Sequence, residues 1–172
     1  MSFVKDYIAF SEHTGSFIKP LLKVHLLCIF FFRISHILYK IKLIPLSRFF
    51  WFINRVFFSI DIDPRAKLNG GVVILHGIGV VIGRYVVAEG DFKIYQGATL
   101  GGNNGKESWR NGAKFSQPII LGNCVIGINA VVLGPVILNI GVRVGANAVV
   151  TKDVPENSVV VSHNRIIYDF KK

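Results

Sequence analysis

The chain has 172 residues, enough for one domain with an appended segment but too few for two large domains. Twenty lysines and arginines stand against ten aspartates and glutamates, so the net charge is +10 and an anionic partner is expected. The two cysteines, Cys28 and Cys124, lie in apolar surroundings without the spacing of metal ligands. This pattern excludes a disulfide framework and a zinc site, and it indicates a reducing cytoplasm.

Residues 16–60 are rich in apolar and basic side chains. The longest apolar run contains Lys23 and His25 and ends at Arg33, well short of the roughly 20 residues of a membrane span. We predict two or three helices here, with Pro45 as a break near the start of the last one. These helices would cover the open end of the repeat domain that begins after residue 60. A compatible alternative is that they lie in the plane of a membrane surface and contact anionic lipid headgroups. The basic residues that would face the headgroups are Lys23, Arg33, Lys40, Lys42, Arg48 and Arg55.

From Ile62 to Val154 an aliphatic residue returns every six positions, and four positions after each one stands a second apolar residue. A helix cannot keep a period of six on one face, and the hexads are rich in β-branched residues and glycine. Hexapeptide repeats predict a parallel β-helix, in which three hexads close one triangular coil; a β-sandwich with coincidental spacing is the alternative. The phase breaks at two extra residues, 80–81, and at a polar stretch at about 101–117. The first residues of the hexads are Ile62, Leu68, Ile74, Ile82, Ala88, Ile94, Ile120, Ile126, Val132, Leu138, Val144 and Val150, and the second set is Ala66, Val72, Ile78, Val86, Phe92, Ala98, Cys124, Ala130, Val136, Val142, Ala148 and Val154.

The fold class is therefore mainly β. We divide the chain into an N-terminal helical segment at 1–60 and a β-helix at 61–172, with an extruded loop at about 101–117 and a C-terminal tail. His76 lies between strands beside two glycines that let a ligand come close, so it is a candidate general base. The other histidines, His13, His25, His36 and His163, have no comparable setting.

Several blocks between Asp61 and Val160 carry a resemblance to a known family: DIDP, LHGIGVVIG, YQGATLGG, IGINAVVLGPV and VGANAVVTKDVP. In this order and spacing they resemble the serine acetyltransferase branch of the hexapeptide-repeat acyltransferases. The resemblance implies a left-handed parallel β-helix that assembles as a homotrimer or a pair of trimers. It also implies an acetyl-CoA-dependent O-acyltransferase, a transferase with active sites between subunits.

The resemblance assigns His76 as the base that takes the proton from the acceptor hydroxyl, and Asp61 as the carboxylate that orients its ring. A hydroxyl is a poor nucleophile, so a base that titrates near neutral pH suits this reaction. Small residues and basic side chains would bind acetyl-CoA between neighbouring subunits. The matching positions are Gly101, Gly102, Gly127, Ile128, Arg143, Ala146 and Lys152, with Arg165 as an addition.

Two departures from the family bear on the acceptor. Leu75 replaces an aspartate that meets the substrate amine, and Ser116-Gln117-Pro118 replaces an Arg-His-Pro run. An amino-acid zwitterion would lose partners for both charges. The expected acceptor is therefore a sugar hydroxyl of capsule, O-antigen or exopolysaccharide, as in the short polysaccharide O-acetyltransferases that the chain also resembles. The alternatives are a serine acetyltransferase of cysteine biosynthesis and an inactive β-helix scaffold.

The polar loop at 101–117 fits an acceptor site on this interpretation. Trp109 offers an apolar face to a sugar ring or to the cofactor, and Arg110 and Lys114 would hold an anionic group, with Gln117 nearby. The expected location is the cytoplasm, at the inner face of the membrane if the N-terminal helices contact lipid. Nucleic-acid binding has no motif behind it.

Overall fold

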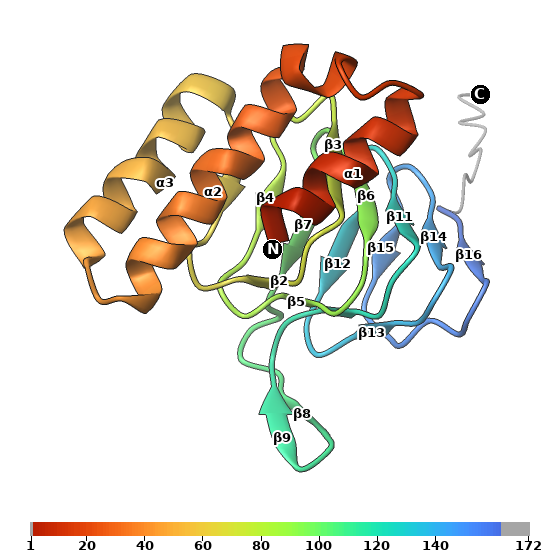
Figure 1. Cartoon of the computed structure of the whole chain (residues 1–172). Coiled ribbons are helices and arrows are strands. Elements are labelled where there is room, and N and C mark those ends of the chain that lie inside the picture. The colour runs from red at the N-terminus through yellow and green to blue at the C-terminus, as the bar shows by residue number, and fades with distance from the viewer. Residues whose placement is uncertain (1, 163–172) are drawn as a thin grey trace, which may run out of the picture.

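A helical cap covers one end of a three-sided β-helix in the computed structural model, which describes residues 2–162 (Figure 1). Pro45 lies in the first turn of α3, where its missing N–H removes no helical hydrogen bond. No helix in this range is long and apolar enough to cross a membrane. The cap consists of α1 (Ser2–Thr14), the 3-10 helix η1 (Lys19–Leu22), α2 (Val24–Lys40) and α3 (Ile44–Phe58).

The β-helix has three parallel sheets, and consecutive strands of the chain go to different sheets. Sheet A contains β1 (Asp61–Ile62), β4 (Val81–Ile82), β7 (Thr99–Gly101), β12 (Val131–Leu133) and β15 (Val149–Val150). Sheet B contains β2 (Lys67–Leu68), β5 (Val87–Ala88), β10 (Ile119–Ile120) and β13 (Ile137–Leu138). Sheet C contains β3 (Val72–Leu75), β6 (Phe92–Tyr95), β11 (Cys124–Ile126), β14 (Arg143–Val144) and β16 (Val159–Val160). An antiparallel hairpin of β8 (Ser108–Arg110) and β9 (Ala113–Phe115) projects from the prism (Figure 1).

The register of the strands follows the six-residue repeat. Ile82 pairs with Leu100, eighteen positions on, so one coil is three hexads long. Ile62 pairs with Ile82, twenty positions on, because two residues are inserted after the third hexad. The predicted left-handed parallel β-helix is confirmed.

The core of the prism is filled by the residues that the repeat points inward. Every first residue of a hexad is buried, and Leu100 fills the same position in β7. In the second set Ile78 is the exception, since its side chain is 72% exposed. The two inserted residues push the corner after β3 outward, and Val80 takes the buried position instead.

Helices α1 and α2 close the end of the prism against β3. Phe10, Ile29 and Phe32 join the core of the β-helix. A buried ion pair fixes this contact: Asp6 accepts hydrogen bonds from Arg33 at 2.8 and 3.0 Å and from the backbone N–H of Val72 at 3.0 Å. Arg33 therefore does not face a membrane, and that part of the prediction is wrong.

Candidate functional site

His76 lies at the corner where the chain passes from sheet C to sheet A. It follows β3 directly, its backbone is left-handed, with φ 58°, and its side chain is exposed. A side chain at Gly77 would lie 2.7 Å from Cδ1 of Ile60 and 2.9 Å from Cδ2 of His25. Glycine at this position therefore lets α2 bring the His25 ring up to the corner that carries His76.

A cavity of about 390 Å³ opens beside His76, between the corner and the cap. It combines an apolar floor with imidazole and ammonium groups, and no described residue that lines it carries a carboxylate. The lining residues are Phe10, His13, Thr14, Lys19, Lys23, His25, Ile74, Leu75 and His76.

The electrostatics of this cavity favour neutral imidazoles at the cap side. Burial, His76 and Lys23 lower the pKa of His25. Burial, Lys93 and Lys23 lower the pKa of His13. A group that enters the cavity therefore meets the two lysines as its cations, and the setting suits a carboxylate better than an ammonium group.

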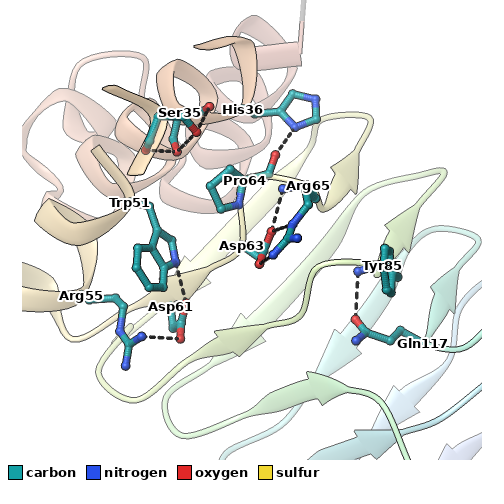
Figure 2. A network of polar contacts seen from close by, with 11 residues as sticks. Ser35, His36, Trp51, Arg55, Asp61, Asp63, Pro64, Arg65, Tyr85 and Gln117 are labelled. Carbon is teal, nitrogen blue, oxygen red and sulfur yellow. Dashed lines mark hydrogen bonds and ion pairs between the residues drawn. The ribbon is translucent and has the colours of Figure 1, made fainter. Parts of the chain in front are cut away.

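Asp61, the predicted partner of His76, starts β1 under helix α3 (Figure 2). Its Oδ1 accepts a hydrogen bond from Nε1 of Trp51 at 2.8 Å, and its Oδ2 lies 3.6 Å from Nη1 of Arg55. The Arg55 guanidinium also stacks over the Trp51 ring at 4.9 Å. Within residues 2–162 no hydrogen bond joins Asp61 to His76, so the orienting role stays a prediction.

Three of the predicted cofactor residues lie at the same corner as His76, on later coils. Backbone hydrogen bonds connect successive turns of this corner, from Gly97 N to Ile78 O at 2.9 Å and from Asn147 N to Ile128 O at 2.8 Å. The corner thus stacks His76 with the predicted positions Gly127, Ile128 and Ala146. A Cβ at Gly127 would lie 2.7 Å from the Val144 carbonyl oxygen, so this glycine is already required by coil stacking.

The remaining cofactor positions lie elsewhere. Gly101 ends β7 and Gly102 follows it, at the border of sheet A opposite the His76 corner, and Lys152 follows β15 at that same border. Arg143 starts β14 and is exposed on sheet C. A Cβ at Gly101 would meet nothing closer than 3.7 Å, so an alanine fits there without a clash. Arg165 lies outside the described residues, as does His163.

The predicted acceptor residues are on the projecting hairpin or at its base. Trp109 is 68% exposed at the pairing position opposite Lys114. Arg110 forms an ion pair with Glu89, and Lys114 with Glu107, so both cations have partners within the chain. Gln117 accepts a hydrogen bond from the backbone N–H of Tyr85 at 3.0 Å (Figure 2). The hairpin and His76 thus lie on opposite borders of sheet A within one chain.

The cap residues of the cavity were not predicted from the sequence. His13 and His25 have no functional setting in the sequence, and the structure places both beside His76. The signal in the sequence was the concentration of Lys19, Lys23 and two histidines around the connection between the first two helices, with His13 at the end of α1 and His25 at the start of α2. That signal does not say which corner of the β-helix these residues would reach.

Comparisons with known proteins follow this geometry. No family model matches the chain. The serine acetyltransferase of Synechococcus elongatus is 39% identical over 137 residues, which are 79% of this chain and 54% of the relative. That of Helicobacter pylori strain J99 is 38% identical over 136 residues, 79% of this chain and 74% of the relative. The structure of the Brucella abortus serine acetyltransferase in complex with coenzyme A matches with a TM-score of 0.83 and 29% identity, over 95% of this chain and 64% of that one.

The fold and the corner histidine define a β-helix of the hexapeptide-repeat acyltransferase type. Within that class, the chain belongs to the serine acetyltransferase family. It spans about half the length of several of the curated relatives that it matches.

The prediction of a sugar acceptor, and with it a role in polysaccharide biosynthesis, is wrong: the matching relatives are serine acetyltransferases, the alternative that was kept open. The incorrect inference rested on Leu75 and Gln117, which replace residues expected to bind the amine and the carboxylate of serine. Two substituted positions change the charge of a pocket locally, whereas the likeness extends over about 130 residues of the chain.

Proposed function

We propose that the chain catalyses acetyl transfer from acetyl-CoA to the hydroxyl of L-serine, in the cytoplasm. The observation that carries the proposal is the solvent-accessible His76 in a cavity of a chain that belongs to the serine acetyltransferase family. Relatives of the chain bear this activity in their names, and one has been solved with coenzyme A.

In the proposed reaction Nε2 or Nδ1 of His76 takes the proton of the serine hydroxyl as its oxygen attacks the thioester carbonyl carbon. The carbon–oxygen bond forms and the carbon–sulfur bond then breaks. The imidazolium of His76 returns the proton to the leaving sulfur, which departs as the free thiol. Asp61 would orient the ring of His76 if its side chain turned away from Trp51.

The cavity suggests how the acceptor is held. Lys19 and Lys23 border it and would bind the serine carboxylate through charge-assisted hydrogen bonds. Leu75 cannot pair with the serine ammonium, and no carboxylate lines the described cavity. We therefore expect the amine to contribute little to binding and the KM for serine to be high.

The acetyl-CoA site would require two protomers. The corner of His76 offers backbone groups of Gly127, Ile128 and Ala146. The other predicted positions lie across sheet A in the same chain, at Gly101, Gly102, Lys152 and Trp109. In a homotrimer, the border of sheet A that carries Gly101 and Lys152 in one protomer would lie beside the His76 corner of its neighbour. Arg143 or Lys152 would then meet the phosphates of acetyl-CoA. Multi-angle light scattering tests this assembly, and a catalytically active monomer would contradict it.

The function is tested by thiol release from acetyl-CoA with L-serine as the acceptor, and by mass spectrometry of O-acetylserine. The informative variant is His76→Asn, because asparagine tolerates the left-handed backbone at this position. We expect kcat to fall about a hundredfold or more. The matched control is His36→Asn, since His36 bonds the Pro64 carbonyl oxygen at 2.7 Å, remote from the cavity (Figure 2). No serine-dependent thiol release by the wild type would overturn the proposal.

A gain of function sharpens the same proposal. Leu75→Asp places a carboxylate in the cavity next to His76 and supplies a partner for the ammonium. We expect kcat/KM for serine to rise roughly tenfold, with 3-hydroxypropionate, which lacks the amine, unaffected or worse. Equal gains for both acceptors would show that Leu75 does not face the amine.

A further inference from the structure

The fully buried side chains of helix α3 are polar, unlike those of an ordinary surface helix. The side chains that it buries are Ser47 and Asn54. Ser47 exchanges hydrogen bonds with Ser35 of α2 at 2.7 and 2.8 Å, and Asn54 donates to the Cys28 carbonyl oxygen at 2.9 Å. The contact between α2 and α3 combines these polar groups with stacked rings, since the ring centroid of Phe31 lies 6.0 Å from that of Phe50 and 6.1 Å from that of Phe58.

The outer face of α3 is apolar. Phe49, Phe52 and Val56 follow one another at spacings of three and four, so they form one stripe, and each is 55% exposed. Phe57 beside them is 74% exposed. Figure 1 shows α3 as the outermost element of the cap, with α2 between it and α1. Further exposed apolar side chains lie at the start of α3, at Ile44 and Leu46, and in the turn before it, at Ile41 and Leu43.

Cations border this stripe. Lys40 and Lys42 lie at the turn, and Arg48 and Arg55 flank the ring of Trp51 at 5.2 and 4.9 Å from its centroid. The sequence has no aspartate or glutamate anywhere from residue 13 to residue 60. An apolar stripe with a basic border is typical of a helix that lies in the plane of a bilayer surface.

The charges distinguish a bilayer from a second copy of the chain. If two α3 faces packed on each other, the apolar stripes would match but the cations of both copies would gather around them. Arg55 already lies 3.6 Å from Asp61 of its own chain, and no acidic side chain of residues 13–60 could pair with Lys40, Lys42 and Arg48. An anionic bilayer surface satisfies both features at once, because headgroups meet the cations and acyl chains receive the phenylalanines.

From this combination we infer that α3 and the turn before it form a peripheral docking surface for a membrane that contains anionic lipid. At 15 residues α3 is too short to span a bilayer, so it lies in the interface with its phenylalanine stripe inserted. The cavity of His76 is lined by residues of α1, η1, α2 and β3 and their flanking positions, and by none of α3. Docking would therefore leave the proposed transferase site open.

The test is flotation of the full chain with vesicles of phosphatidylcholine alone and with 30% phosphatidylglycerol, about 30% being a typical anionic fraction for such assays. We expect flotation with the anionic vesicles and little with the neutral ones. Phe49→Ser/Phe52→Ser should lower the bound fraction at least roughly tenfold, because two inserted rings are lost. Lys42→Glu/Arg48→Glu should abolish the preference for anionic vesicles. The control is Val159→Ser/Val161→Ser, which removes two exposed apolar side chains at the far end of the β-helix.

Each other outcome overturns the inference. Wild-type protein that does not float with anionic vesicles contradicts it directly. Equal flotation of the phenylalanine variant and the control would mean that net charge alone attracts the vesicles. If the phenylalanine variant lowers the mass measured by light scattering and leaves flotation unchanged, a second copy of the chain covers the face. Circular dichroism checks that both variants keep their helices.

Discussion

The cap and the β-helix follow different rules for which side chains are buried. In the β-helix the place of a residue in its hexad decides: Ile94 is buried, and its neighbour Lys93 is exposed on the same strand. In the cap, α3 buries Ser47 and exposes Phe49. In a repeat, each position has equivalent neighbours on the coils above and below, so the local sequence determines which side chains are buried. In a single helix, the elements that pack on it determine which side chains are buried.

The largest effect is expected where the cap is joined to the β-helix by charge. Asp6→Ala leaves Arg33 buried without its carboxylate and leaves the Val72 N–H without its acceptor, so we expect a loss of about 3–5 kcal/mol in the free energy of unfolding. Urea denaturation monitored by circular dichroism measures it. The double variant Asp6→Leu/Arg33→Met should regain most of the loss. A cost below about 1 kcal/mol for Asp6→Ala would mean that the cap does not depend on this pair.

An intermediate effect is expected within the stacked coils. In Gly127→Ala the added Cβ would lie 2.7 Å from the Val144 carbonyl oxygen and 2.9 Å from Ala146 N, so we expect a loss of about 1–3 kcal/mol. Gly101→Ala is the matched control, because its Cβ would make only ordinary van der Waals contacts, at 3.7 Å or more, and should cost about 0.5 kcal/mol or less. If Gly101 meets acetyl-CoA as proposed, this control raises the KM for acetyl-CoA while stability stays unchanged. Equal stability losses at the two glycines would contradict the stacking argument.

The smallest effect is expected from pH, and it belongs to the cap. Burial is the main cause that lowers the pKa of His13, His25 and His36 from 6.5. Below that pH these histidines bind protons in the unfolded chain but stay neutral in the folded chain. Their contribution to the free energy of unfolding is therefore present above pH 6.5 and is lost as the pH falls. We expect the Tm to be level from pH 7.5 to 6.5 and to fall by a few degrees towards pH 5.

His25→Asn isolates the contribution of one of these imidazoles to the pH dependence. The variant should show a shallower fall in Tm between pH 6.5 and pH 5, as measured by differential scanning calorimetry. A wild-type Tm that rises towards pH 5 would contradict the assigned direction of the pKa shifts.

Much of the β-helix could be predicted because its repeat is local. The hexad positions named the core, and the two extra residues at 80–81 predicted a break that appears as the register of Ile62 with Ile82. The same reasoning failed at Ile78, because periodicity alone does not say on which side of an insertion the buried position resumes. The glycines beside His76 identified it as a candidate base, but the residues that surround it in the cavity could not be predicted.

The order of residues by itself determined the three-sided coil, the corner that carries His76 and the apolar, basic character of the cap, because each depends on neighbours within a few positions. Only the tertiary structure decided that His13, His25 and two lysines meet His76 in one cavity, that Trp51 holds Asp61, and that Arg33 is buried against Asp6. These contacts join the cap helices to one another and to the β-helix, and they depend on how the cap packs on the prism. No local periodicity specifies that packing, since it depends on the shapes of both parts together.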